Sequence, residues 1–555
     1  MDYINSAADE AVHQANRVYH HLLARVDAPQ YEKLTYHDAA PAAVAMAATS
    51  VSWPSAWPSA WPSAWPSASW PRIWSKKLAA VVVALVLLVV AGHAVFSSQP
   101  TASDPFADAR RHLTKEAFID AVMREPVEGL VDLEPIRNQC QMAIQKPGLV
   151  WMCDYMQGGL GNLGNTWISC MYFGIESGAT TIVLPRVGIR NDNNLIDNGN
   201  YKNTVDLSIL YDLDHFIETW EQACPHIKVY KSATEVPNLM GVGGKTLSPH
   251  RMAGLETVRV TVVDAGSWRV AFDEWLPTRF TPDALRLMSP EKPVLVIAKA
   301  LLFACHRASM DPRFANAFAR LFRFKDSLRR LGAAAVWGLE QRVGQPLVAD
   351  SILFPEAYAK TYGPPVRDTP DDLSAVNTSL VTHLLPHRVT PHGFMGAHLR
   401  ADSDAQKMHW PGYDDQVPEY LREALARNLT SIYLAAGTPE SAQRFRSDAA
   451  MLGLTTYTKE DVLGEEDMAE YKALSWDNKA VVDFQVLLHA SYFAGFGQST
   501  FSQAMAVRRS VLPDAGPNQV SPWRPFTGPS FEIWRDNLSS IFCGLHSQTL
   551  DMIWP

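Results

Sequence analysis

Residues 149–184 read LVWMCDYMQGGLGNLGNTWISCMYFGIESGATTIVL, and this stretch decides the fold. It begins and ends with apolar runs of strand length, Leu149–Cys153 and Thr180–Leu184, and the residues between them, up to Ser177, favour a helix. A strand, a helix and a second strand in this order are typical of a βαβ unit, which belongs to a parallel sheet covered by helices. The stretch therefore predicts an α/β fold.

The same alternation continues along the first half of the chain. Pro293–Ala298 is another apolar run of strand length, and Phe314–Leu331 follows it as an amphipathic helix with arginines on its polar face. We predict a first Rossmann-like lobe over residues 136–345. The next stretch, 346–390, is rich in Pro, Thr and Asp, which indicates an irregular connection between lobes.

A second series of strands and helices follows this connection. Strands are predicted at Gly393–Leu399, Ser431–Ala435 and Tyr492–Phe496, and helices at Pro418–Asn428, Pro439–Leu452, Ala480–Ala490 and Thr500–Val507. The series predicts a second Rossmann-like lobe over residues 391–530 and a C-terminal return segment over residues 531–555. We expect the two lobes to face a cleft, because open α/β sheets bind ligands at the ends of their strands.

An uninterrupted apolar segment, LAAVVVALVLLVVAGHAVF, occupies residues 78–96. It contains no Asp, Glu, Lys or Arg, and as a helix it would extend about 28 Å, which is close to the thickness of a hydrocarbon core. A cleaved signal peptide would lie nearer the start of the chain, and a buried core helix would show a polar stripe. The segment therefore predicts one transmembrane helix.

Basic residues around this segment set the predicted orientation. Lys76 and Lys77 directly precede it, whereas the next basic residue after it is Arg110. The positive-inside rule then keeps residues 1–77 in the cytoplasm, which is the type II orientation, and residues 97–135 are interpreted as a stem. Within the tail, the sequence WPSA is repeated four times, which makes this segment a low-complexity one. A proline in every repeat prevents a helix from forming there. Its tryptophans suit a bilayer interface, and repeat slippage without function is the alternative.

Composition bounds the partners of this 555-residue chain. Hydrophobic residues make up 47%, which is enough for large cores, and a formal net charge of -9 gives no broad positive field, so we expect no nucleic-acid partner. All six cysteines follow the apolar segment, and so do three glycosylation sequons that begin at Asn377, Asn428 and Asn537. Both features suit an oxidising lumen, while the pairing of the cysteines stays open.

Two motifs precede predicted helices and could contact an anion. The first, GGLGNLGN at residues 158–165, has glycines that let backbone amides approach an anionic or sugar ligand, although a simple tight turn would also use them. The second, FGQSTF at residues 496–501, places Ser499 and Thr500 to present hydroxyl and amide groups to a phosphate, or alternatively to cap the helix.

A third motif, His398-Leu-Arg400, lies at the predicted end of a strand. A guanidinium there can grip a diphosphate with two hydrogen bonds, and His398 lies on the same face of the strand. A structural histidine and an ordinary ion pair are the alternatives. Asp402 and Asp404 follow. Such a pair can hold a divalent metal, but acidic residues beside an arginine more often orient it, so we expect no metal.

Together these motifs resemble the GDP-fucose protein O-fucosyltransferase superfamily, most clearly in their order along the chain. The family's G-x-x-G-N element is matched within residues 158–162, its H-x-R motif by residues 398–400, and its last block, which runs from V-D to a serine-rich turn and Phe, by residues 482–501. The resemblance covers roughly residues 145–525 and leaves out the tail and the stem.

The resemblance implies a GT-B fold with two Rossmann-like lobes. It also implies inverting transfer of fucose from GDP-fucose, without a metal or another cofactor. By motif position, Arg400 would stabilise the leaving GDP and Asn162 would lie near the transferred sugar, so these two are the catalytic candidates. The implied donor-binding residues are Gly159, Gly161, His398, Asp483, Ser499, Thr500 and Phe501.

Two positions depart from the family pattern. The usual double serine is Ser499-Thr500, and the acid common before the short strand is Ser491. No carboxylate in the first motif is an obvious base, so removal of the acceptor's proton is left open.

The leading hypothesis is therefore a lumenal fucosyltransferase that acts on a hydroxyl of a protein or glycan acceptor. Its predicted place is the membrane of the Golgi or the endoplasmic reticulum, with one helix in the lipid bilayer. One alternative keeps the fold and uses another nucleotide sugar. Another is a catalytically inactive lumenal protein that binds glycans or serves as a scaffold.

Overall fold

The computed structural model describes residues 105–188, 190, 203–252, 257–258, 261–363, 388–523, 531–543 and 547–555. The predicted transmembrane helix, the WPSA repeats and the first sequon lie outside these residues. Among the described helices, none has the length and apolar character that a membrane span requires. The chain divides into two compact units, Met1–Asp108 and Ala109–Pro555, and the fold below is that of the second unit.

The first lobe is built on a five-stranded parallel sheet with the order β5-β2-β1-β9-β6. Its strands are β1 (Lys146–Cys153), β2 (Ala179–Val183), β5 (Lys228–Tyr230), β6 (Lys245–Leu247) and β9 (Val294–Ala298). In the register of the central strands, Val150 lies between Thr181 and Leu295. The opening βαβ unit is confirmed, because β1, the helix α6 (Leu160–Glu176) and β2 follow one another with β1 and β2 parallel.

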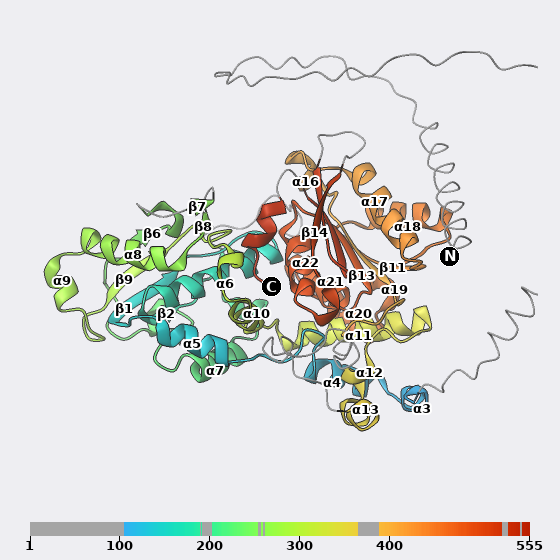
Figure 1. Ribbon diagram of the computed structural model, residues 1–555, viewed down its shortest axis with the longest axis horizontal. Helices are drawn as coiled ribbons and strands as arrows, with labels where there is room; N and C mark the ends of the chain where they lie inside the picture. The colour runs from blue at the N-terminus through green and yellow to red at the C-terminus, as the bar shows by residue number, and fades with distance from the viewer. Residues whose placement is uncertain are drawn as a thin grey trace, which may run out of the picture. The chain divides into compact units, whose positions relative to one another are not determined.

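Helices cover this sheet and short pairs of strands complete the lobe (Figure 1). Besides α6, the helices are α5 (Glu134–Met142), α7 (Leu213–Ala223), α8 (Ala265–Arg279), α9 (Pro282–Arg286) and α10 (Pro312–Arg320). The short strands are β3 (Val187–Gly188) with β4 (Thr204–Val205), and β7 (Thr257–Val258) with β8 (Thr261–Val262).

The second lobe contains a seven-stranded sheet with the order β12-β11-β10-β13-β16-β15-β14. The strands from β12 to β16 in this order run parallel, and β15 and β14 are antiparallel additions. Their bounds are β10 (Met395–Leu399), β11 (Ser431–Ala436), β12 (Thr455–Tyr457), β13 (Tyr492–Phe496), β14 (Gln519–Trp523), β15 (Phe531–Arg535) and β16 (Ser539–Cys543). The three strands predicted from the sequence are confirmed as β10, β11 and β13, and two further strands come from the segment that was expected only to return.

The helices of the second lobe follow the predicted order. They are α16 (Ser403–Lys407), α17 (Tyr413–Ala426), α18 (Pro439–Met451), α19 (Lys459–Val462), α20 (Glu465–Lys472), α21 (Trp476–Leu488) and α22 (Thr500–Ser510). Both lobes therefore have the predicted α/β architecture with parallel sheets. In Figure 1 the two sheets lie side by side, and α6 of the first lobe lies near α22 of the second.

One predicted helix is divided into two in the structure. The sequence favours a single helix over residues 314–331, but the structure has α10, which ends at Arg320, and a separate helix α11 (Asp326–Val343). The residues between them form backbone hydrogen bonds with residues 210–212: Asp212 donates to the carbonyl of Arg323, and Lys325 donates to that of Leu210. A backbone that is bonded to a distant segment cannot continue the hydrogen bonds of a helix.

The folded region also begins earlier than the sequence suggests. Helix α4 (Lys115–Arg124) lies in the predicted stem, yet its residues Phe118, Ile119, Ala121 and Val122 are buried in the main core, and α4 packs against α11. A short helix, α3 (Ala107–Arg111), precedes it. The predicted connection, in turn, contains two short helices, α12 (Asp350–Leu353) and α13 (Pro355–Tyr362).

The C-terminal residues pack against α6. After the 3-10 helix η6 (Ser547–Met552), the indole nitrogen of Trp554 donates to Ser169 Oγ at 3.0 Å and its backbone amide donates to Asn165 Oδ1 at 3.0 Å. The amide of Asn165 also donates to the carbonyl of Met552 at 3.1 Å. This buried contact holds the helix whose first turn carries the glycine-rich motif.

Two disulfides support the first lobe. Cys140–Cys224 joins α5 to the end of α7, and Cys153–Cys170 joins β1 to α6. The sequence predicted disulfides without their pairing, and the structure supplies it for four cysteines. Cys305 is buried as a free thiol, and the side chain of Cys543 is outside the described residues.

Candidate active site

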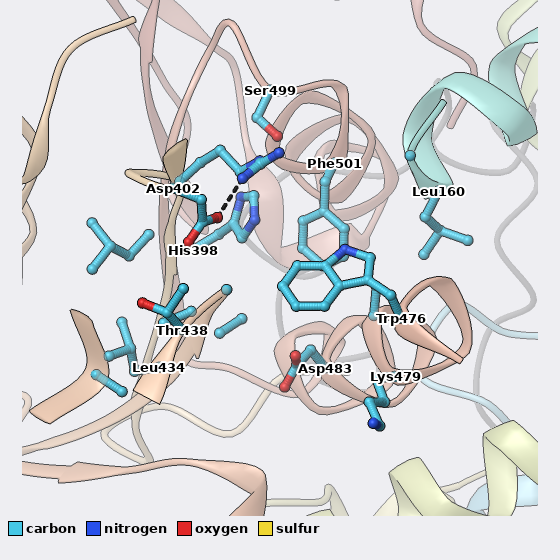
Figure 2. A pocket seen from close by; sticks show the side chains of 18 of the residues that line it. Leu160, His398, Asp402, Leu434, Thr438, Trp476, Lys479, Asp483, Ser499 and Phe501 are labelled. Atoms are coloured by element: carbon cyan, nitrogen blue, oxygen red, sulfur yellow. Dashed lines mark hydrogen bonds and ion pairs between the residues drawn. The ribbon is translucent and has the colours of Figure 1, made fainter. Parts of the chain in front are cut away.

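A cavity of about 960 Å³ opens at the carboxyl ends of the parallel strands of the second lobe. Each of β10, β11, β12 and β13 is followed directly by residues that line it: Arg400, Thr438, Lys459 and Ser499 are examples. The first lobe adds the start of α6, represented in Figure 2 by Leu160. Ligands of open α/β sheets bind at this edge, so the cavity is the candidate site.

All of the residues that the sequence singled out for a site line this one cavity. They are Gly159, Gly161, Asn162, His398, Arg400, Asp483, Ser499, Thr500 and Phe501. The structure therefore brings together motifs that are more than 300 residues apart in the chain, while the individual roles predicted for them stay predictions.

Two helix N-termini line this cavity. The N-cap residues are Gly159 for α6 and Ser499 for α22, and neither makes a side-chain capping hydrogen bond. The first amides of a helix have no partner within it and carry a partial positive charge, so uncapped ends suit an anion. The cavity thus has two backbone sites for negative charge, one in each lobe.

The two helix ends approach each other closely at Gly161. A Cβ on Gly161 would lie 2.4 Å from the carbonyl carbon and oxygen of Thr500, which leaves room for no other residue type without movement of the backbone. One residue further on, the hydroxyl of Thr500 donates to Asn162 Oδ1 at 2.7 Å. The glycine in the first motif is therefore needed for packing, and the hydrogen bond orients the amide of Asn162.

His398 is held in an aromatic environment. Its ring centroid lies 4.3 Å from that of Phe501, and a hydrogen bond of 2.7 Å joins its Nδ1 to Ser502 Oγ. Burial, with the positive charges of Arg400 and Lys459, lowers the pKa of His398 to about 3. The imidazole is therefore neutral at physiological pH and too weakly basic to serve as an efficient general base. Trp476, the first residue of α21, lines the same cavity (Figure 2).

Arg400 is held by two carboxylates. Its two terminal nitrogens donate to Asp402 and Asp404, and its backbone carbonyl accepts from Gln416 Nε2 at 2.9 Å. Burial raises the pKa of Asp402 even though Arg400 favours its charged form. These contacts are the ones expected if the acidic pair orients the arginine. Within the described residues no cluster of three metal-ligating side chains is found.

Asp483 is paired inside the protein. It accepts a hydrogen bond from Tyr433 at 2.8 Å and one from Lys459 at 2.8 Å. Burial alone would lower the pKa of Lys459, but the negative charges of Asp483 and Glu460, together with the hydrogen bond to Asp483, outweigh it and the pKa is raised. The carboxylate lines the cavity, as predicted, but its charge is compensated by a lysine that the sequence analysis did not select.

Sequence reasoning missed several cavity residues, among them Arg190, Thr438, Lys459 and Trp476. Thr438 and Lys459 follow β11 and β12, so the rule that places ligands at carboxyl ends of strands could have found them. Trp476 opens a helix without a recognisable motif. Arg190 follows β3 in a stretch with no periodic signal.

Comparison with known proteins decides the family. The family model for GDP-fucose protein O-fucosyltransferase matches residues 151–512, which is more than half of the chain. The chain belongs to this family. It is therefore a glycosyltransferase of the fucosyltransferase class that uses GDP-fucose, and the sequence-based prediction of family and activity is confirmed at this level.

Individual relatives are distant. No curated protein matches the chain. A crystal structure of POFUT1 in complex with GDP-fucose aligns with a TM-score of 0.37 and 10% identity over 72% of this chain and 98% of that chain. POFUT1 in complex with GDP gives 0.35 and 11% over 72% and 99%, and an Arg-to-Lys mutant of Arabidopsis thaliana FUT1 in complex with GDP gives 0.25 and 11% over 71% and 75%. The family assignment rests on the family model alone.

Proposed function

We propose that this fucosyltransferase binds GDP-fucose in the 960 Å³ cavity and transfers fucose, with inversion, to a hydroxyl of a protein or glycan acceptor. The observation that carries the proposal is the convergence of two uncapped helix N-termini with Arg400 at one end of a parallel sheet. These groups are suited to a diphosphate, which carries negative charge on both phosphates.

The nucleotide and the sugar would occupy different parts of the cavity. The aromatic rings of His398, Phe501 and Trp476 offer flat surfaces for the base. The start of α22 would receive the diphosphate through the amides that follow Ser499. Asn162 at the start of α6 would contact fucose, because Thr500 fixes its amide oxygen and leaves the amide nitrogen to donate. This arrangement supports a GT-B organisation, with the donor between two Rossmann-like lobes.

Transfer would proceed by displacement at C1 of fucose. The acceptor oxygen forms a bond to C1 from the face opposite the phosphate, the C1–O bond to the β-phosphate breaks, and its electron pair stays on GDP. The acceptor's proton passes to solvent. Arg400 and the helix amides stabilise the charge that grows on the departing phosphate, which is where preorganised donors lower a barrier most. His398 is neutral and half-buried, so we assign it to binding and not to proton removal.

The location of the reaction is part of the same proposal. We place the catalytic lobes in the lumen of the Golgi or endoplasmic reticulum, tethered by a type II helix at residues 78–96. Two disulfides in the first lobe support an oxidising compartment, because such bonds rarely persist in the cytosol. Asn428, in one of the sequons, is exposed just after α17, as an attachment site for a glycan must be.

The direct test incubates the purified full-length chain with GDP-fucose, GDP-mannose, UDP-glucose and UDP-galactose over an acceptor panel of glycans and folded protein domains. Release of the nucleoside diphosphate is measured. We expect turnover with GDP-fucose and much slower turnover with the other donors. Efficient use of a different donor would overturn the choice of sugar. Tight binding of GDP without turnover on any acceptor would favour an inactive glycan-binding protein.

A further inference from the structure

Arg190 is a buried cation that the family motifs do not include. It follows β3, lines the cavity and is only 8% exposed. The described residues of the first lobe that line the cavity are otherwise glycines, Asn162 and apolar residues, so Arg190 is the charged group that this lobe contributes to it.

The surroundings of Arg190 leave one of its hydrogen-bond donors without a partner. Its Nε has no hydrogen-bond partner, and Asp477 Oδ1 lies 3.7 Å away, which is too far for a hydrogen bond. The guanidinium also lies at the N-terminus of a helix, which is the positive end of its dipole. Its Nη2 is 3.2 Å from the position that a Cβ on Gly159, the N-cap of α6, would take. A cation beside the positive end of a helix dipole is unfavourable, unless an anion binds between them.

The charge of Arg400 gives a second, independent reason to expect another cation. Arg400 donates to both Asp402 and Asp404, so this cluster has no net positive charge of its own. A diphosphate that contacted only this cluster would remain uncompensated. A guanidinium whose ion pair with Asp477 is too long for a hydrogen bond, placed next to the start of a helix, supplies additional positive charge.

We infer that Arg190 binds the donor's diphosphate as a second guanidinium, supplied by the first lobe while Arg400 belongs to the second. This inference rests on the proposed function, because it requires GDP-fucose in the cavity. The phosphate would accept hydrogen bonds from Arg190 and from the first amides of α6. Because Asn162 in the same turn is assigned to the sugar, the phosphate concerned is the β-phosphate, which is attached to the sugar.

The test is the affinity of the full-length chain for GDP and for GMP, measured by isothermal titration calorimetry in wild type and Arg190→Gln. We expect the dissociation constant for GDP to rise about tenfold to a hundredfold, the usual effect of losing a charge-assisted hydrogen-bonded pair. GMP lacks the β-phosphate, so its dissociation constant should change far less. Arg190→Lys, which keeps the charge but not the fork, should recover part of the loss.

Arg313→Gln is the matched control. Arg313 lies on α10 outside the cavity and also has a loose ion pair, 3.6 Å from Asp132, so its loss should leave GDP binding unchanged. Thermal melting checks that each variant is folded. Equal losses for GDP and GMP, or an unchanged GDP affinity with a raised KM for acceptor, would overturn the assignment to the β-phosphate. Absence of GDP binding by the wild-type chain would instead overturn the proposed function.

Discussion

Replacing Gly161 with alanine tests whether the ends of α6 and α22 must meet for the site to form. A Cβ at this position would lie 2.4 Å from the carbonyl carbon and oxygen of Thr500 and 2.7 Å from the amide nitrogen of Phe501. These are backbone atoms, so no side chain can rotate away. Ordinary contacts between such atoms are about 3.5 Å. The two helix ends must therefore separate by about 1 Å.

The expected magnitude combines two opposing effects. Overpacking of this kind costs about 1–3 kcal/mol of unfolding free energy, and a Gly-to-Ala change in a helix returns at most about 1 kcal/mol. We expect Gly161→Ala to lower the free energy of unfolding by about 1–2 kcal/mol. Binding should suffer more specifically, because the hydrogen bond of 2.7 Å from Thr500 to Asn162 and both sets of free amides shift together. We expect the dissociation constant of GDP to rise at least tenfold, which corresponds to a loss of about 1.4 kcal/mol or more of binding free energy.

Gly164→Ala provides the control on the same helix. Its Cβ would lie 3.2 Å from the hydroxyl oxygen of Tyr211, so the contact is with the end of one side chain and not with a backbone. We expect unfolding free energy within about 1 kcal/mol of wild type and unchanged GDP affinity. Urea unfolding and calorimetric titration with GDP measure both quantities. If Gly161→Ala bound GDP as tightly as Gly164→Ala, the two helix ends would not act as one anion site.

Three further predictions follow from the buried charges. Arg400→Lys keeps a cation between the two carboxylates but loses the fork, so kcat for GDP release should fall about 100-fold or more while the melting temperature changes little; near wild-type kcat would contradict the role in the transition state. Lys459→Met leaves Asp483 buried without its cation, which should cost about 3–5 kcal/mol in urea unfolding, and adding Asp483→Asn should recover part of it; no recovery would refute the pairing. Burial lowers the pKa of His489 to about 4, which is below its value of about 6.5 in the unfolded chain. The unfolded chain therefore binds a proton first as the pH falls from about 6.5 toward 4, and this group costs the folded state about 3 kcal/mol of stability. His489→Gln should flatten the pH dependence of the urea midpoint.

The structure changes which substitution at Arg400 is informative. From the sequence alone, Arg400→Ala would be expected to remove activity and leave the fold intact. The structure places Asp402 and Asp404 on this guanidinium with little exposure of either carboxylate. Alanine would leave two buried acids unpaired, which is itself destabilising. Arg400→Lys keeps a positive charge beside both carboxylates, so a fall in its activity reports on catalysis and not on loss of stability.

The location of the site could be predicted because it follows from local rules. The strands β10 and β13 show as apolar runs, and the chemistry of a parallel sheet lies where such strands end. Residues that follow the ends of these strands, such as Arg400 and Ser499, could therefore be assigned to one cleft from the sequence alone. The glycine-rich turn joined them through the order of motifs along the chain.

The features that sequence reasoning missed depend on distant partners. The break between α10 and α11 is imposed by backbone bonds to residues 210–212, which no local pattern of residues 314–331 reveals. The pairing of Cys140 with Cys224 needs the three-dimensional arrangement of α5 and α7. The helix in the expected stem is different, because the apolar residues of α4 already have helical spacing and could have been recognised.

An acidic chain can bind an anionic donor here because the attraction is local and comes from helix N-termini and a few cations around one cavity. Lys459 is neutralised by Asp483, His398 is uncharged and Arg400 is matched by two acids. The cavity also presents positive charge through the N-termini of two helices, Arg190 and lysines such as Lys407, Lys472 and Lys479. Partial charges fixed in a buried cleft are screened little by salt and unaffected by a formal net charge of -9 spread over the whole chain. A net negative charge therefore gives no general attraction to nucleic acid, yet it is compatible with binding of a nucleotide at one site.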